Sequence, residues 1–468
     1  MQTDSSIAPM HVALFPSAGM GHLAPFLRLA VALDARGCSV TFISILPTVS
    51  SAESSHLSHF FSTYPQIHCM EFHLPRNEPS TASPADPFFL QWESIRRSAH
   101  LLPSLLTSIS PPISALITDI TLTSSIFDAV ANLPFSNYVL FTSCAATLAL
   151  FSYFPITAQS DTFDANCQLQ IPGLQPIPNS DIPPPLLLPK NLFKTTVMEN
   201  GLALMKADGI IVNTFDALEP NTLMALNKGI VVPAFPPVVT VGPLERCSFE
   251  HSREGTKQQL FSWLNAQPAR SVMYVSFGSR NALSRDQIKQ LAEGLEKSNC
   301  RFLWAVKSKV VDKEDMVTLG ELVGDEFLER VKEKGVVVNG WVEQWGVLGH
   351  PAVGGFMSHC GWNSVTEAAW HGVPVLAWPQ AGDQRINAGV VERSGLGIWE
   401  RKWGWGGDNA EVVMGAEIGE KLQEFMNNAG IRVSAARVRE EAKCAISAGG
   451  TSASSWMNLV ERLKSKVI

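Results

Sequence analysis

Residues 341–384 read WVEQWGVLGHPAVGGFMSHCGWNSVTEAAWHGVPVLAWPQAGDQ, and they predict a strand, a polar turn and a helix in direct succession. Residues 353–357 form a short apolar run, and residues 358–363 are rich in hydrogen-bonding groups. A helix is expected to begin near Ser364, because Ser364 and Glu367 stand in capping-box spacing. The segment therefore predicts an α/β fold in which a helix starts directly after a strand.

Such a helix start is a natural seat for a phosphate group. The first N–H groups of the helix lack partners within the helix, and they point with its positive dipole end to the space above the sheet. The side chains of His359, Asn363 and Ser364 would add hydrogen-bond donors there. From the spacing alone, Glu367 could equally be a capping partner and His359 a structural turn residue.

The whole segment resembles the signature segment of plant UDP-glycosyltransferases of secondary metabolism, with tryptophan first, HCGWNS in the middle and Asp-Gln at the end. By position, the resemblance implies that Trp341 stacks on uracil, Gln344 lies beside the ribose and base, and Glu367 accepts the ribose hydroxyls. The residues that it implies for the rest of the donor are His359, Asn363, Ser364 and the backbone of Trp362 at the diphosphate, and Asp383 and Gln384 at the sugar.

The terminal Gln384 is associated in this family with glucose, so the resemblance implies UDP-glucose as co-substrate. It implies no permanently bound cofactor and no metal.

The chain has 468 residues, which is too long for one ordinary domain, and at 46% hydrophobic it can form two cores. A net charge of −7 without a basic run argues against a nucleic acid or an anionic membrane as partner. Eight singly scattered cysteines without metal-ligand spacing predict reduced thiols. We find neither a signal-peptide pattern nor an apolar run of membrane-spanning length, and expect a cytoplasmic monomer.

The first half begins with a β-α-β pattern. Residues 11–15 (HVALF) read as a buried strand, PSAGMGH as a glycine-bearing turn that ends at His22, and residues 40–45 as the next strand. Later apolar runs end at Asp119 and at Thr142. Because parallel strands end at one edge of a sheet, His22, Asp119 and Thr142 are expected on the same rim.

The second half repeats this pattern, with a strand at 271–276, a turn FGSR, a helix at 285–298 and a strand at 302–306. The predicted fold is therefore α/β, with two facing Rossmann-like doubly wound domains and a cleft between them. The resemblance implies that this is the GT-B fold. We place an acceptor-binding domain at 1–244, a linker at 245–257, a UDP-sugar-binding domain at 258–450, and at 451–468 a terminal helix that packs back across the domain boundary.

His22 is the candidate general base, because an imidazole titrates near neutral pH and a cleft-facing turn can present it to an acceptor. Asp119 could hold the second ring nitrogen in the correct tautomer. A structural turn histidine and a strand-end cap are the alternatives. The resemblance places both residues at the catalytic positions of the family, Thr142 at the sugar and Ser279 at phosphate, with Arg280 as a further phosphate partner.

Three segments resemble plant flavonoid C-glucosyltransferases more closely than the common O-glucosyltransferases: residues 11–30, 86–106 and 115–125. This implies an inverting, UDP-glucose-dependent C-glucosyltransferase that forms β-C-glucosides on phloretin-like dihydrochalcones or 2-hydroxyflavanones. The residues expected either to line its acceptor pocket or to form helix core are Phe88, Phe89, Trp92 and Ile95. The alternatives are an O-glucosyltransferase, a nucleotide-sugar-binding protein without turnover, and a sugar-nucleotide epimerase.

Overall fold

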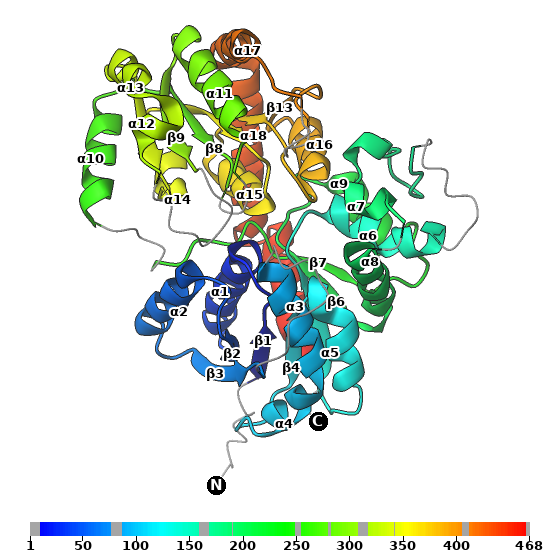
Figure 1. Cartoon of the computed structure of the whole chain (residues 1–468). Coiled ribbons are helices and arrows are strands. Elements are labelled where there is room, and N and C mark those ends of the chain that lie inside the picture. Colours follow the sequence, from blue (N-terminus) through cyan, green and yellow to red (C-terminus); the bar gives the residue numbers. More distant parts are fainter. Residues whose placement is uncertain are drawn as a thin grey trace.

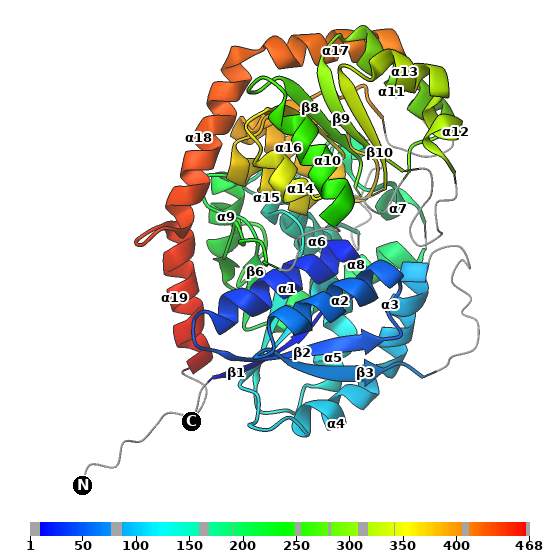
Figure 2. The same cartoon turned by 90° about the vertical axis from the view of Figure 1, so that its left-hand side faces the viewer.

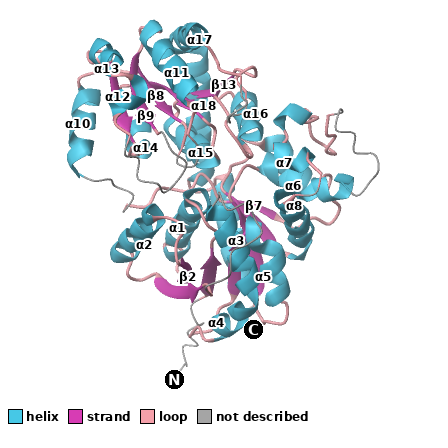
Figure 3. Ribbon diagram, in the orientation of Figure 1, coloured by secondary structure: helices cyan, strands magenta, loops and turns pink. Residues whose placement is uncertain are grey.

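The structure is a computed structural model that describes residues 10–75, 87–158, 168–189, 191–248, 254–278, 282–307, 317–340, 342–404 and 411–464. They form two parallel sheets, one in the lower and one in the upper half of Figure 1. Helices cover the faces of both sheets (Figure 3). The prediction of two Rossmann-like doubly wound domains is confirmed.

The first sheet has the strand order β3-β2-β1-β4-β5-β6-β7. Its strands are β1 (His11–Phe15), β2 (Ser39–Leu46), β3 (His68–His73), β4 (Ala115–Asp119), β5 (Ser136–Phe141), β6 (Gly209–Val212) and β7 (Val238–Thr240). The helices of this half are α1 (Met20–Asp34), α2 (Ser51–Thr63), α3 (Pro87–Ser98), α4 (Leu102–Thr107), α5 (Thr123–Ala129), α6 (Ala145–Ala158), α7 (Pro184–Leu187), α8 (Leu192–Ala203) and α9 (Pro220–Asn227).

The second sheet has the order β10-β9-β8-β11-β12-β13. Its strands are β8 (Val272–Ser276), β9 (Arg301–Val306), β10 (Gly335–Asn339), β11 (Val353–Ser358), β12 (Val375–Ala377) and β13 (Gly397–Trp399). The helices are α10 (Glu254–Asn265), α11 (Arg285–Lys297), α12 (Leu319–Val323), α13 (Asp325–Val331), α14 (Gln344–Leu348), α15 (Trp362–His371), α16 (Gln384–Ser394), α17 (Gly415–Asn427), α18 (Ala429–Ile446) and α19 (Thr451–Lys464).

Strand β1 shows why the apolar runs form central strands. All five of its residues are buried, and successive side chains point to opposite faces of the sheet. Val12 and Leu14 pack in one core cluster, and Ala13 and Phe15 pack in another on the other face. A continuous apolar run is therefore what a strand covered by helices on both faces requires.

The last helix returns to the first domain. In Figure 2, α18 runs beside the second domain and α19 continues down along the first. Trp456 of α19 donates from Nε1 to the carbonyl of Val241 over 3.1 Å, and Ser452 donates to the carbonyl of Gly242 over 2.6 Å. Leu459 joins the core cluster of β1. The C-terminal segment thereby ties the two domains together.

Within the described residues, we find no helix that combines the length and the apolar character needed to cross a bilayer.

Candidate active site

The candidate site lies at the switch points of the two sheets. Strand order reverses between β1 and β4 in the first sheet and between β8 and β11 in the second. In open α/β sheets, ligands bind at the carboxyl ends of the strands at such points. His22 lies in the first turn of α1, because this helix begins at Met20, so the expectation of a turn that extends to His22 is wrong. Strand β4 ends at Asp119, and the turn after β11 carries His359.

The structure brings His22 and Asp119 together. His22 donates from Nδ1 to Oδ2 of Asp119 over 2.8 Å, and Thr142 Oγ1 lies 3.1 Å from the same nitrogen. Asp119 is fully buried, and its Oδ1 accepts hydrogen bonds from the N–H and hydroxyl of Thr121. The carboxylate is thus held from both sides, and it fixes the Nδ1–H tautomer of His22, in which Nε2 carries the lone pair.

A buried glutamate, Glu53, holds the turn between β1 and α1, directly before the helical turn that carries His22. Glu53 of α2 accepts the N–H of Gly19 at Oε1 over 2.6 Å and the N–H of Val49 at Oε2 over 3.1 Å. Gly19 has a φ of +99°, which favours glycine, and a Cβ there would lie 3.1 Å from the ring of Phe88. These contacts hold the turn before α1 and thereby the start of the helix that carries His22.

The phosphate-facing turn is as the segment 341–384 predicts, with one correction. Strand β11 ends at Ser358, and α15 begins at Trp362 rather than near Ser364. The expected capping box is wrong, because no side chain caps this helix and Glu367 points elsewhere. The N-terminal N–H groups of α15 consequently have no capping side chain and lie at the carboxyl end of β11.

Glu367 belongs to a polar cluster at the domain interface. Its Oε1 accepts from Nη2 of Arg28 over 2.7 Å, and its Oε2 accepts from Nε2 of Gln344 over 2.8 Å. Gln344 also donates to the hydroxyl of Ser364 over 3.1 Å. Three residues predicted for donor binding, Gln344, Ser364 and Glu367, thus lie together.

The start of α15 contacts the first turn of α1, which carries His22. Asn363 donates from Nδ2 to the carbonyl of Gly21 over 3.4 Å. Trp362 is buried, and its indole donates to the carbonyl of Asn213 in the first domain over 2.8 Å. The side chain of Trp362 therefore joins the two domains, and its backbone N–H lies in the first turn of α15.

His359 lies against two glycines. A Cβ at Gly278 or at Gly361 would each approach Nε2 of His359 to 2.5 Å. Burial lowers the pKa of His359 to about 4, so the imidazole is neutral at pH 7. A neutral imidazole has a single N–H to donate, and in this structure the ring already has a hydrogen bond to the backbone of Ser276.

On the expectation that His359 contacts the diphosphate, Gly278→Ala should weaken UDP binding by roughly tenfold or more, because the new methyl group displaces the His359 ring. Gly278 has a φ of +80°, and Gly37 has the same φ with no atom within 4 Å of its Cβ position. Gly37→Ala is therefore the matched control: both variants carry the backbone strain of about 1–2 kcal/mol, and only Gly278→Ala adds the collision. Calorimetric titration with UDP measures the difference, and equal affinities in the two variants would contradict the prediction.

Asp383 and Gln384 both accept hydrogen bonds, and Asp383 accepts them from both domains. Asp383 Oδ2 accepts from the hydroxyl of Ser143 in the first domain and from Nδ2 of Asn387 over 2.9 Å. Gln384 Oε1 accepts the N–H groups of Gln380 and Ala381 over 2.8 and 2.9 Å, which closes the loop before α16. The two side chains are thereby held at the same edge of the sheet as His359.

The remaining predicted residues fall into two groups. Trp341, Ser279 and Arg280 lie outside the described residues. Of the acceptor-pocket candidates, Trp92 and Ile95 pack in the core below β1, with Ile95 fully buried and the indole of Trp92 bonded to the carbonyl of Thr121. They belong to the core in this structure, which is the alternative that the sequence left open, whereas Phe88 and Phe89 are half-buried.

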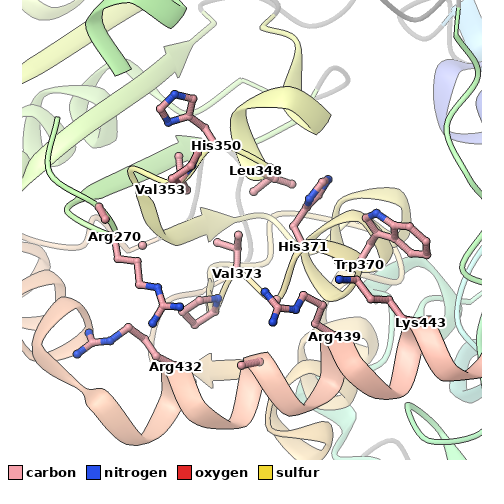
Figure 4. A pocket seen from close by; sticks show the side chains of 17 residues that line it. Arg270, Leu348, His350, Val353, Trp370, His371, Val373, Arg432, Arg439 and Lys443 are labelled. Carbon is pink, nitrogen blue, oxygen red and sulfur yellow. The ribbon is translucent and has the colours of Figure 1, made fainter. Parts of the chain in front are cut away.

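A cavity of about 460 Å³ lies at the opposite edge of the second sheet, where the strands begin (Figure 4). Its basic side chains are Arg270, Arg432, Arg439 and Lys443. They gather where α14, α15 and α17 end, and Arg432 donates to the carbonyl of Met426 in α17 over 2.6 Å. Cations at helix C-termini balance the negative dipole ends. Arg432 therefore has a structural partner at a helix end, and Arg439 pairs with Glu440. The switch-point edge, where the start of α15 lies, remains the candidate seat for a diphosphate.

Among the described residues, no three His, Cys, Asp or Glu side chains are grouped so that they could hold a metal ion.

Comparison with known proteins shows the family of this chain. A family model described as UDP-glucoronosyl and UDP-glucosyl transferase matches residues 229–401. UDP-glycosyltransferase 708G2 of Citrus unshiu is 51% identical over 460 residues, which cover 97% of this chain and 96% of that protein. The chain belongs to the UDP-glycosyltransferases.

Two further relatives of this UDP-glycosyltransferase carry information on the fold and the ligand. UDP-glycosyltransferase CGT of Oryza sativa subsp. indica is 49% identical over 94% of this chain and 93% of its own length. The crystal structure of LpCGTa in complex with UDP is 49% identical, covers 97% of this chain and 99% of its own, and superposes with a TM-score of 0.86. The GT-B fold predicted for this UDP-glycosyltransferase is confirmed.

The sequence analysis missed two residues of this UDP-glycosyltransferase that contact the predicted site: Arg28 and Ser143. Arg28 stands in the apolar helix segment FLRLAVAL, where a charge needs a buried partner, and this was a usable signal. Ser143 follows Thr142 at a strand end, but nothing in the sequence pairs it with Asp383, which is 240 positions away.

Proposed function

We propose that this UDP-glycosyltransferase is an inverting C-glucosyltransferase that moves glucose from UDP-glucose to an aromatic carbon of a flavonoid-type phenol. The observation that carries the proposal is the contact of Asn363 with the carbonyl of Gly21, because it sets the donor turn of one domain against the His22 turn of the other. A base and a diphosphate seat on opposite sides of one cleft are what glycosyl transfer needs.

We divide the donor UDP-glucose into uridine, diphosphate and glucose and assign each part to residues of the cleft. We assign the uridine to Trp341, Gln344 and Glu367, the diphosphate to His359, Asn363, Ser364, the backbone of Trp362, Ser279 and Arg280, and the glucose to Thr142, Asp383 and Gln384. The dipole and N–H groups of α15 support the diphosphate assignment, since they stabilise the negative charge that grows on the leaving phosphate. UDP in the related LpCGTa structure supports the nucleotide assignment.

His22 then acts as the general base. Its Nε2 takes the proton of an acceptor phenol while Asp119, at Nδ1, stabilises the imidazolium. The acceptor attacks the anomeric carbon from the face opposite the diphosphate, and the bonding pair of the broken C–O bond leaves with UDP. This direct displacement inverts the α-linked donor to a β-glucoside.

Carbon transfer needs only a change of acceptor pose. Loss of the phenolic proton places negative charge on the ortho and para carbons, so the ring orientation decides whether carbon or oxygen faces the sugar. When carbon attacks, the new C–C bond forms as the bond from the anomeric carbon to UDP breaks, and the ring becomes a dienone. The proton on the attacked carbon then passes to solvent, the aromatic ring is restored, and the ring oxygen takes back the proton held by His22. The names of the 49% identical relatives, CGT and LpCGTa, support the carbon assignment. An O-glucosyltransferase with the same donor site and base is the alternative.

Incubation with UDP-glucose and phloretin, followed by boiling of the product in acid, is expected to leave glucose attached to the aromatic ring. A C–C bond resists acid hydrolysis, whereas an O-glucoside releases glucose. Mass spectrometry before and after boiling measures the outcome, with His22→Ala protein as the control without turnover. Release of all the glucose would establish the O-glucosyltransferase, and the absence of any product would contradict both.

A further inference from the structure

The domain interface contains a buried ion pair that the proposed reaction does not use. Arg28 of α1 donates from Nη2 to Oε1 of Glu367 in α15 over 2.7 Å, and the two side chains are only 4% and 7% exposed. Arg28 belongs to the first domain, and Glu367 is the residue to which we assign the ribose hydroxyls. A residue of the acceptor domain thus touches the nucleoside end of the donor site.

The carboxylate of Glu367 has capacity for both roles. An ionised carboxylate offers about four lone-pair positions, two on each oxygen. Arg28 occupies one position on Oε1, and Gln344 occupies one on Oε2 over 2.8 Å. One position on each oxygen remains, which matches two neighbouring ribose hydroxyls.

We propose that Arg28 is a positioning residue for the sugar donor, which holds Glu367 oriented so that the carboxylate accepts the ribose hydroxyls. This inference rests on the ribose assignment made above. In this proposal helix α1 of the first domain contributes to donor recognition. Donor affinity therefore depends on contact between the two domains.

The physical reason is the cost of a buried charge without its partner. Without the guanidinium, Glu367 would keep a buried carboxylate that lacks one of its two hydrogen-bond donors, so the side chain would rotate toward solvent or toward another donor. Either change removes acceptors from the ribose. The effect should therefore fall on the donor and spare the phenolic acceptor, although α1 also carries His22 near its start.

Arg28→Gln is expected to raise the Kd for UDP by roughly 10- to 100-fold, the range for loss of a hydrogen bond to a charged group. It should also reduce the preference for UDP over 2′-deoxy-UDP, since a misplaced Glu367 no longer reads the 2′-hydroxyl. Calorimetric titration measures both ratios. The KM of the phenol and the kcat at saturating UDP-glucose should change by less than about threefold.

Asp181→Asn is the matched control. Asp181 lies in the first domain and faces Arg385 of the second domain over 3.5 Å, with side-chain exposures of 10% and 8%. The variant weakens a similarly buried interdomain ion pair, together with the 3.3 Å contact of Asp181 with Arg401, outside the residues assigned to the donor. It is expected to lower the melting temperature and to keep the Kd for UDP within about twofold.

A lower melting temperature in Arg28→Gln with an unchanged Kd and an unchanged 2′-deoxy ratio would show a purely structural bridge and overturn the proposal. If Arg28→Gln does not fold, Arg28→Lys decides, because it keeps the charge and loses the planar fork; an unchanged Kd there also overturns it. Glu367→Gln distinguishes failure of the positioning role of Arg28 from failure of the ribose assignment of Glu367. If it weakens UDP binding and the Arg28 variants do not, only the positioning role fails; if none does, the ribose assignment fails as well.

Discussion

His22→Ala is expected to lower the kcat of glucosyl transfer by about 10³-fold, within the range for loss of a general base, while the Kd for UDP stays within about twofold. The base touches the acceptor, and the residues assigned to UDP lie in the other domain, so chemistry and donor binding separate. Steady-state kinetics with a phenolic acceptor and calorimetry with UDP measure the two effects.

A pH profile tests the same role more directly. A phenol loses its proton in solution near pH 10, so the residual rate of His22→Ala should rise with pH until the acceptor ionises without help. His100→Ala is the control, because His100 is exposed and bonds only its own helix segment at Arg97 among the described contacts. Retention of more than about a tenth of the wild-type rate by His22→Ala at pH 7 would remove His22 from the base role.

Asp119→Asn is expected to lower kcat by about 10²- to 10⁴-fold with little change in shape. Thr121 donates two hydrogen bonds to Oδ1 of Asp119, so the oxygen of the new amide will stay on that side. The amide NH₂ then faces Nδ1 of His22, donates to it and leaves the proton on Nε2. That is the wrong tautomer for a base.

The matched control is Asp128→Asn, since Asp128 is 70% exposed and pairs with Lys206 at the surface. It makes the same chemical change away from the cleft and should keep full activity. UDP affinity should be unchanged in both variants. A kcat for Asp119→Asn within about threefold of the wild type would show that the carboxylate neither orients nor stabilises the imidazole.

The two-domain fold and the rim of candidate residues could be predicted because they follow from local patterns. Apolar runs such as residues 11–15 can only be strands covered on both faces, and parallel strands bring their carboxyl ends to one edge. The approach of His22 to Asp119 follows from this geometry. The capping box failed because the same Ser-x-x-Glu spacing also suits a helix whose glutamate serves a distant partner.

Burial at helix α3 shows a second limit of local patterns. Its aromatic face could line a pocket or pack on the sheet, and both need the same spacing of apolar residues. The structure turns Trp92 and Ile95 into the core and leaves Phe88 against the His22 turn. The direction in which a helix face points depends on where the sheet lies, and the helix sequence alone does not contain that.

Local sequence patterns determine which segments are strands and helices, and they also determine the glycine-bearing turns and the donor segment. These features could therefore be predicted from the sequence alone. The pairing of Arg28 with Glu367 and of Ser143 with Asp383 was decided by domain packing, across 339 and 240 positions. Each pair joins polar groups that burial would otherwise penalise. Which distant partner satisfies them depends on how two complete cores meet, and no local pattern records that.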